Sequence, residues 1–221
     1  MENILAFDTS QTVLSVALCY KGRVFSRHED SPRAQAQNIL ATINAVLEEA
    51  GASLSEVSLI CVGAGPGSFT GIRIAVSVAQ GLAFSQNIAV LPVSSLACVA
   101  QEIFTKTALE EVLVVIDARM NEVYCGAYQY DKTLGFMVGT DVLLKPAEVV
   151  NSFRGSYALV GDAISMIGSD AASTEMSYRG SEILPNAEFL ITIAQKSEAR
   201  ILPFQAHPIY IREKVVIDSA G

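Results

Sequence analysis

Apolar runs of strand length open the chain. Residues 4–7 and 13–20 are dominated by Val, Leu, Ile and Ala, and residues 24–27 follow as a shorter run. The Lys21-Gly22 dipeptide between the second and third runs is typical of a tight hairpin turn. Three successive strands predict an antiparallel start, which differs from the βαβ units that open a simple doubly wound fold.

Two helical stretches follow in the first half of the chain. Residues 32–50 come after Ser31, a candidate N-cap, carry Pro32 at the first helical position and stop at Gly51. Their apolar residues recur every three to four positions, so one face of this helix is apolar. The next predicted elements are a strand at 57–62, a helix at about 70–84 and a strand at 88–93.

The second half partly repeats this order. After a helix at 95–105, the pattern predicts strands at 112–116, 123–130 and 142–144, a short helix from Pro146 and a strand at 157–160. Residues 163–184 are polar and weakly patterned, so no element is predicted there. A helix at 187–196 precedes the C-terminal tail.

The composition favours a soluble protein of the cytoplasm. Apolar residues make up 51% of the 221 residues and charged residues 17%, which is enough to bury a large core. The net charge is −8 and no basic run is present, so any contact with nucleic acid is expected to go through a partner. The start of the chain has no basic and apolar leader, and apolar stretches break before about 20 residues, so no membrane partner is expected.

Residues that usually carry metal or nucleophilic chemistry are scattered. The four cysteines are far apart and none forms a CxxC pair. This pattern is typical of cysteines that are buried as small apolar side chains in a reducing compartment. His28 and His207 belong to no HExxH motif, and no GxSxG sequence is present. The sequence therefore predicts no catalytic residue, no metal ligand and no cofactor.

A glycine-rich turn, GPGSFTGIR at residues 65–73, leads into the second helix. Glycines allow close backbone approach and free amides at a helix start attract anions, so Gly65, Gly67 and Ser68 are candidates for a phosphate cradle. The spacing matches neither the lysine-bearing Walker motif nor GxGxxG. A tight turn that starts a closely packed helix is the alternative interpretation.

Asp8, Thr9 and Ser10 directly follow the first strand. In folds of the actin, Hsp70 and sugar-kinase type, this hairpin meets the phosphates or the metal of a nucleotide. The other interpretation is an Asx turn, in which the Asp8 carboxylate binds its own backbone. The candidate residues of a relic nucleotide site are thus Asp8, Thr9, Ser10, Gly65, Gly67 and Ser68.

The helix at about 70–84 is apolar around most of its circumference. Its polar residues form one narrow stripe of Arg73, Ser77 and Gln80. The rest comprises a row of small residues and an adjacent row of larger ones: Ala75, Ala79, Ala83, Ile74, Val78 and Leu82. This arc is wider than the roughly 100° that a surface helix needs. Either the fold covers it on both sides or another chain does.

The turn between the strands at 112–116 and 123–130 concentrates polar groups. Asp117, Arg119, Glu122 and Tyr124 all fall within it or beside it. They are either substrate-facing or ordinary solvated hairpin residues, and both interpretations stay open.

Four motifs together resemble the TsaB (YeaZ) family. They are ILAFDTS, GPGSFTGIRIA followed by QGLA, DARMNEVY and PIYIRE, in the family's order across residues 4–213. The resemblance implies an α/β protein with a duplicated actin-like (ASKHA, ribonuclease H-like) fold of two lobes with mixed sheets, the second reduced. The expected lobes are residues 1–104 and 105–221, and the helix at 187–196 is a candidate to pack back on the first lobe.

The resemblance also implies partners. Proteins of this family pair with TsaD, which transfers a threonylcarbamoyl group to the adenosine 3′ of the anticodon in tRNAs that read ANN codons. A TsaE-type ATPase joins through the complex, and tRNA is contacted only indirectly. The stretch from Ala34 to Gln37 has no histidine where the catalytic relatives carry metal-binding ones, which suits a non-catalytic paralogue.

In the family, the two helices of the first lobe form the subunit interface, and a homodimer is expected through the same surface when the partner is absent. A bulky charged residue at Ala79 is expected to break pairing while leaving the fold intact. The predicted interface residues are Ile39, Ile43, Val46, Arg73, Ile74, Ala75, Val78, Ala79 and Leu82.

An enzyme remains the alternative. Asp8 and the glycine turn also suit a small ATP-binding phosphotransferase or ATPase of the actin and sugar-kinase class. Such a site needs an adenosine-binding glycine loop late in the chain, and Gly161-Asp162-Ala163 is only a fragment of one. A peptidase, suggested by an old label of the metal-bearing relatives, is weaker because the two histidines form no ligand motif.

Overall fold

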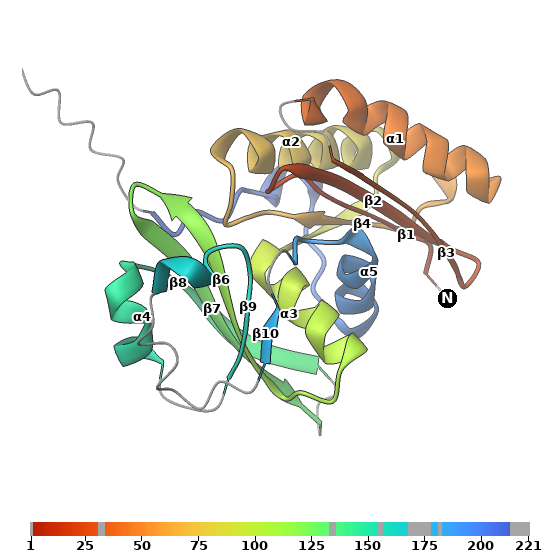
Figure 1. Ribbon diagram of the computed structural model, residues 1–221. Helices are drawn as coiled ribbons and strands as arrows, with labels where there is room; N and C mark the ends of the chain where they lie inside the picture. Colours follow the sequence, from red (N-terminus) through yellow and green to blue (C-terminus); the bar gives the residue numbers. More distant parts are fainter. Residues whose placement is uncertain are drawn as a thin grey trace, which may run out of the picture.

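Two five-stranded sheets form the framework of the chain in this computed structural model (Figure 1). The structure describes residues 2–30, 34–132, 136–153, 157–167, 178–180 and 183–212. Strands of the first hundred residues build the first sheet, and strands after residue 110 build the second.

The first sheet begins antiparallel and continues parallel. Its order is β3 (Arg23–Asp30), β2 (Val13–Tyr20), β1 (Ile4–Asp8), β4 (Leu59–Gly63) and β5 (Ala89–Val93). β1 pairs antiparallel with β2 and parallel with β4, and every residue of β1 and β4 is buried because helices cover both faces. The carboxyl ends of β1 and β4 therefore meet at one edge, where Asp8 lies beside Gly63.

The second sheet repeats the topology of the first. Its order is β8 (Phe136–Leu144), β7 (Glu122–Asp131), β6 (Glu111–Arg119), β9 (Ala158–Val160) and β10 (Tyr178–Gly180). In each sheet the first strand in sequence pairs antiparallel with the second and parallel with the fourth. β9 and β10 have only three residues each, so the second sheet is the reduced one. This repeat confirms the predicted α/β class and the duplicated actin-like fold.

Helices form three layers around the sheets. α1 (Gln35–Ala50) and α2 (Phe69–Gln86) lie on the outer face of the first sheet (Figure 1). α3 (Ser95–Lys106) and α5 (Ala187–Lys196) pack between the sheets in a core that both share. α4 (Pro146–Ser152) and the 3-10 helix η2 (Ile164–Ile167) cover the far face of the second sheet.

The described residues also form two short 3-10 turns, η1 (Leu54–Glu56) and η4 (Pro203–Gln205). Among the described residues, no helix has both the length and the hydrophobicity needed to cross a bilayer.

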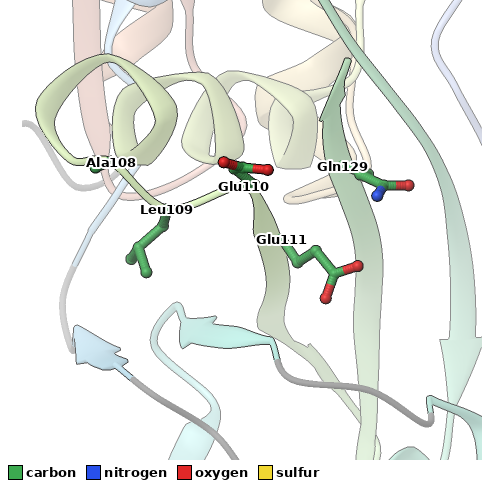
Figure 2. A pocket seen from close by; sticks show the side chains of 5 residues that line it. All are labelled: Ala108, Leu109, Glu110, Glu111 and Gln129. Atoms are coloured by element: carbon green, nitrogen blue, oxygen red, sulfur yellow. The ribbon is translucent and has the colours of Figure 1, made fainter. Parts of the chain in front are cut away.

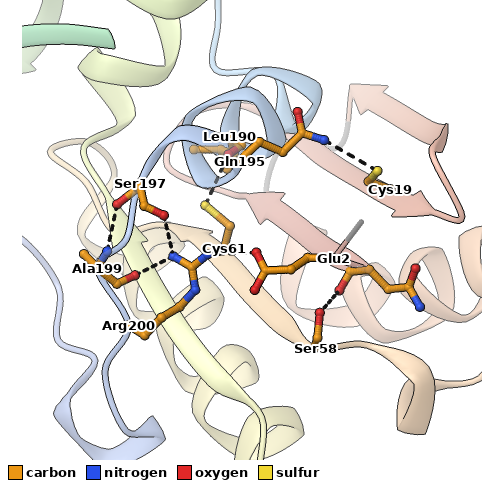
Figure 3. Close-up of polar contacts among 10 residues, drawn as sticks. Glu2, Cys19, Ser58, Cys61, Leu190, Gln195, Ser197, Ala199 and Arg200 are labelled. Carbon is orange, nitrogen blue, oxygen red and sulfur yellow. Dashed lines mark hydrogen bonds and ion pairs between the residues drawn. The ribbon is translucent and has the colours of Figure 1, made fainter. Parts of the chain in front are cut away.

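α5 packs on the sheet formed by the first hundred residues. The Ala187 amide donates to the buried Ser15 hydroxyl of β2 over 2.8 Å. The Cys61 thiol of β4 donates to the Leu190 carbonyl over 3.5 Å, as Figure 3 shows. The division of the chain after residue 104 stays a prediction, since α3 and α5 share one core with both sheets.

Several predicted elements differ from the structure at their ends. The first helix begins at Gln35, with Ala34 at the N-cap position and no side-chain cap, and the predicted starting residues 31–32 lie outside the described part. The strand predicted at 24–27 extends over all of β3, because every residue of β3 pairs with β2. β10 falls within residues 163–184, where the sequence predicts no element, because a strand of three residues is too short to show an alternation of apolar and polar positions.

The four cysteines are buried and free, as the sequence predicts. Burial raises the pKa of the Cys61 and Cys98 thiols far above the usual range, and raises the pKa of Cys125 to about 12. The thiolate is the reactive form, so these three side chains serve packing rather than chemistry.

Candidate functional site

The two segments of the predicted nucleotide site meet at the carboxyl edge of the first sheet. One is the turn after β1, with Thr9 and Ser10, and the other is the turn between β4 and α2. The Ser68 amide donates to the Ser10 carbonyl over 2.7 Å, and the Thr9 hydroxyl donates to the Gly71 carbonyl over 2.7 Å. The two turns therefore bind each other directly.

Two glycines make this contact close. A Cβ atom at Gly67 would lie 2.5 Å from the Ser10 carbonyl oxygen, and one at Gly71 would lie 1.9 Å from the Thr9 carbonyl oxygen. Both distances are well below van der Waals contact, so a side chain at either position would push the turns apart. These glycines serve backbone packing, as the tight-turn interpretation expects.

The C-terminal tail covers another side of the glycine turn. The Ile209 amide donates to the Ala64 carbonyl over 2.7 Å. A Cβ atom at Gly65 would lie 3.2 Å from the Ile209 carbonyl oxygen and 3.1 Å from the Ile72 side chain. Gly65 also has a φ of 101°, which residues with a side chain rarely adopt. Protein atoms thus enclose this glycine as well.

The Asp8 carboxylate is enclosed by serine donors. Its Oδ1 accepts from the amide and the hydroxyl of Ser10, each over 2.7 Å, and its Oδ2 accepts from the Ser95 hydroxyl over 2.8 Å. The bond to the Ser10 amide is the Asx turn of the sequence interpretation. Asp8 is 1% exposed, and burial raises its pKa above the usual value. A phosphate or a metal ion would have to displace these donors to reach the carboxylate.

No cluster of metal-binding side chains forms within the described ranges. There, no group of three or more His, Cys, Asp or Glu side chains is placed to hold an ion. His28 is exposed on β3, and His207 is exposed in the tail. At the start of α1, the Gln35 side chain donates to the Gln11 carbonyl over 3.0 Å, so it anchors the helix to the turn between β1 and β2.

Five of the nine predicted interface residues face the interior of the chain. The apolar faces of α1 and α2 both pack on the first sheet, so the fold itself covers the row of small residues. Their contact with a partner stays a prediction, and the side chains offer almost no free surface for it, because each of the five is 3% exposed or less. They are Ile39, Ile43, Val46, Ala75 and Ala79.

The other four predicted residues lie at the surface of α2. Arg73 is exposed, and Ile74, Val78 and Leu82 are half-buried. Two apolar side chains that the sequence analysis did not assign to the surface join them, since Leu40 is 57% and Phe84 81% exposed. Leu40 directly follows the buried Ile39, so it falls beside the buried stripe of α1. We call these residues the outer helix face: Leu40, Arg73, Ile74, Val78, Leu82 and Phe84.

The charged turn between β6 and β7 is used within the chain. Arg119 pairs with Asp117 over 2.8 Å, and Glu122 accepts from Arg212 of the tail over 2.5 Å. Tyr124 packs against the core between the sheets. The four residues do not converge on one point, which favours the hairpin interpretation over a substrate site.

A shallow depression lies where α3 passes into β6. It has a volume of about 350 Å³ and is lined by Ala108, Leu109, Glu110, Glu111 and Gln129 (Figure 2). Lys132 pairs with Glu110 and offsets part of the negative charge. The depression lies at the end of α3 opposite Ser95, so it is separate from the Asp8 cluster.

Similarity to known proteins extends over nearly the whole chain. The family described as TsaD, tRNA N6-adenosine threonylcarbamoyltransferase, matches residues 28–197. A Haemophilus influenzae protein, tRNA threonylcarbamoyladenosine biosynthesis protein TsaB, is 34% identical over 97% of this chain and 96% of its own length. The chain belongs to the TsaB (YeaZ) family.

Other members of the TsaB family agree in sequence and in fold. The Escherichia coli protein of the same name is 36% identical over 96% of this chain and 95% of its own length. The structure of YeaZ from Pseudomonas aeruginosa has a TM-score of 0.82 at 37% identity and covers 95% of this chain and 100% of its own. A second structure from that organism, described as similar to peptidase YeaZ, has a TM-score of 0.83 at 38% identity, with 96% and 100% covered.

Proposed function

We propose that the chain is a non-catalytic subunit that binds and activates a TsaD-type threonylcarbamoyltransferase during threonylcarbamoyladenosine synthesis in tRNA. The names of its TsaB relatives support the pathway. The observation that carries the proposed role is an exposed apolar helix face on a chain whose Asp8 carboxylate is already bound by its own serines.

The outer helix face is the proposed docking surface for the TsaD-type subunit. Because the TsaD family matches this chain over residues 28–197, the partner is expected to share its fold. Two similar helix pairs can pack against each other in a nearly symmetric way, as in a homodimer. The same face is therefore proposed to form a homodimer when the partner is absent.

The remaining parts of the proposed complex are those that the resemblance to the TsaB family implies. The TsaD-type subunit transfers the threonylcarbamoyl group to the adenosine 3′ of the anticodon in tRNAs that read ANN codons, and a TsaE-type ATPase joins through the complex. Since the net charge of this chain is −8, tRNA is held mainly by the other subunits. The chain is proposed to work in the cytoplasm, without a cofactor or a membrane partner.

Reconstitution tests the proposed role. A TsaD-type subunit, a TsaE-type ATPase, threonylcarbamoyl-adenylate and tRNA are combined with and without this chain, and modified adenosine is measured. We expect modification to depend on the chain. Equal modification without it would contradict the proposal.

Paired surface variants test the docking surface. Leu40→Glu places a charge on the outer helix face, and Val138→Glu places one on β8 at a residue of similar exposure, 57% against 55%. We expect Leu40→Glu to abolish co-purification with the TsaD-type subunit and Val138→Glu to leave it intact. Equal behaviour of the two variants would remove α1 from the interface.

The second candidate function is a small ATP-binding phosphotransferase. The Asp8 turn and the glycine turn meet at the carboxyl edge of a sheet, where ligands bind in many α/β proteins. The mutual hydrogen bonds of these turns disfavour it, because a nucleotide would have to break them. Calorimetry that shows tight Mg-ATP binding by the isolated chain would favour this candidate instead.

A further inference from the structure

Arg73 is held on the surface of α2 by two aromatic rings. Its Cζ lies 3.4 Å from the centre of the Phe69 ring and 5.6 Å from the centre of the Tyr210 ring. Its Nε donates to the Tyr210 hydroxyl over 2.7 Å. Contacts of a guanidinium with aromatic faces are favourable and restrict its motion. The side chain is therefore oriented before a partner arrives.

The tail that supplies Tyr210 is fixed on both sides of this residue. The Ile209 amide donates to the Ala64 carbonyl at the glycine turn over 2.7 Å. Two residues beyond Tyr210, Arg212 binds Glu122 in the turn between β6 and β7 over 2.5 Å. The tail thus runs as a strap from the first sheet to the second and positions the phenol between its two anchors.

The charge of Arg73 has no carboxylate partner in the part of the chain that the structure describes. Four other arginines pair with carboxylates there, and Arg73 does not. Its terminal nitrogens form the planar fork that binds a carboxylate through two parallel hydrogen bonds. Phe69 and Tyr210 are 58% and 52% exposed beside it, and aromatic and arginine side chains are enriched at interface hot spots.

We propose that Arg73, oriented by Phe69 and Tyr210, is the charged anchor of the outer helix face and takes a carboxylate that the TsaD-type subunit presents among apolar side chains. The inference rests on the proposed function, because it names the chemical group that this face recognises. Phe69, one turn before Arg73 on α2, contacts its guanidinium, and Ile74 follows it directly, so these apolar side chains limit access of water to the ion pair and strengthen it.

A second copy of the chain does not supply this carboxylate through α2. The helix sequence FTGIRIAVSVAQGLAFSQ contains no Asp or Glu, so a symmetric pairing of two α2 helices leaves Arg73 unmatched. An RNA phosphate is disfavoured, because Arg73 stands on an apolar helix of a protein with a net charge of −8. A pairing of two copies that supplied a carboxylate would have to use Glu48 or Glu49 at the C-terminal end of α1.

Calorimetric binding of the full chain to a TsaD-type subunit from the same organism tests the anchor. The variants are Arg73→Gln, which removes the charge, Arg73→Lys, which keeps the charge without the fork, and Tyr210→Phe, which removes only the orienting hydroxyl. Arg23→Gln is the matched control, since Arg23 also lies over an aromatic ring, at 5.2 Å from that of Phe25, on the edge strand β3 at the far side of the sheet from β5.

We expect Arg73→Gln to weaken binding about tenfold or more, Arg73→Lys and Tyr210→Phe to weaken it by roughly threefold, and Arg23→Gln to leave Kd unchanged. Higher ionic strength should weaken binding of the wild type more than binding of Arg73→Gln, because only the former makes the ion pair. Melting temperatures identify any variant whose fold has changed.

Equal Kd values for the wild type and a folded Arg73→Gln variant would overturn the anchor and leave the proposed function in place. Absence of binding by the wild type would overturn both. The anchor is also overturned if Arg73→Gln weakens the homodimer as much as the complex, or if its effect requires tRNA, because the charge would then serve self-association or RNA.

Discussion

The Ser95 hydroxyl donates a 2.8 Å hydrogen bond to Asp8 across 87 residues of sequence. Asp8 ends the central strand β1, and Ser95 begins α3, the helix that lies between the two sheets. The same carboxylate also holds the Ser10 backbone and hydroxyl. The Asp8 carboxylate, which the sequence predicts as a nucleotide ligand, therefore joins the end of β1, the turn that follows it and the start of α3.

We expect Asp8→Ala to lower the free energy of unfolding by roughly 2–4 kcal/mol, because it leaves buried donors of Ser10 and Ser95 without an acceptor. Asp8→Asn keeps one acceptor oxygen and should lose less. Urea denaturation of the two variants measures the difference. Unchanged stability together with lost Mg-ATP binding would instead identify Asp8 as a ligand residue.

Ala79→Glu is expected to destabilise the fold by at least about 3 kcal/mol, since Ala79 is 0% exposed against the first sheet. This replaces the sequence-based expectation that a charge there breaks pairing alone. Val78→Glu, on the half-buried side of the same helix, should cost less stability and weaken the complex. Thermal melting and co-purification separate the two effects. A stable Ala79→Glu variant would contradict the observed burial.

Alanine substitutions at two glycines of α2 are expected to change stability in opposite directions. Gly71→Ala should destabilise by at least about 2 kcal/mol, because its Cβ would lie 1.9 Å from the Thr9 carbonyl oxygen and part the two turns. A Cβ atom added at Gly81 would have no neighbour within 4 Å, so Gly81→Ala should stabilise the helix by about 0.5–1 kcal/mol. Denaturant midpoints measure both. A neutral Gly71→Ala variant would show that the turns can separate without cost.

The pH dependence of stability should change in Asp141→Asn. Asp141 accepts from Ser94 over 2.5 Å and from Tyr128, and its burial raises its pKa above 3.8. The folded state therefore holds the proton more tightly than the unfolded state. The stability contributed by protonated Asp141 is fully present below about pH 4 and is lost as pH rises through the folded pKa.

The Asn variant stays neutral at every pH, so it should be more stable than the wild type at pH 7, and the difference should shrink as pH falls toward about 4. Urea denaturation over this range measures the difference. A difference that grows on acidification would mean that the folded protein favours the ionised carboxylate.

The sequence predicts an element wherever burial leaves a recognisable pattern of apolar residues. β1, β2 and β4 are covered on both faces and show as apolar runs, and α1 shows as a single apolar face. β10 is too short for any period. The order of elements could therefore be predicted across most of the chain. The prediction missed β10, the strand that precedes α5.

The residues of the proposed docking surface were harder to predict than the fold, for two reasons. α2 has apolar residues around most of its circumference, so periodicity finds the rows of Ala75 and Ile74 without telling which one faces the sheet. Contacts such as Arg73 with Tyr210 join residues 137 positions apart, and no local pattern marks such a pair. Both assignments depend on tertiary packing.

The strap formed by the tail is synthesised long after the helix whose arginine it orients. At synthesis rates of about 5–20 residues per second, the ribosome needs on the order of ten seconds to pass from Arg73 to Tyr210. During that interval α2 has emerged, but the phenol that orients its arginine has not been made. In the proposed complex, a nascent chain would therefore meet its partner with a less ordered Arg73 than the finished chain presents.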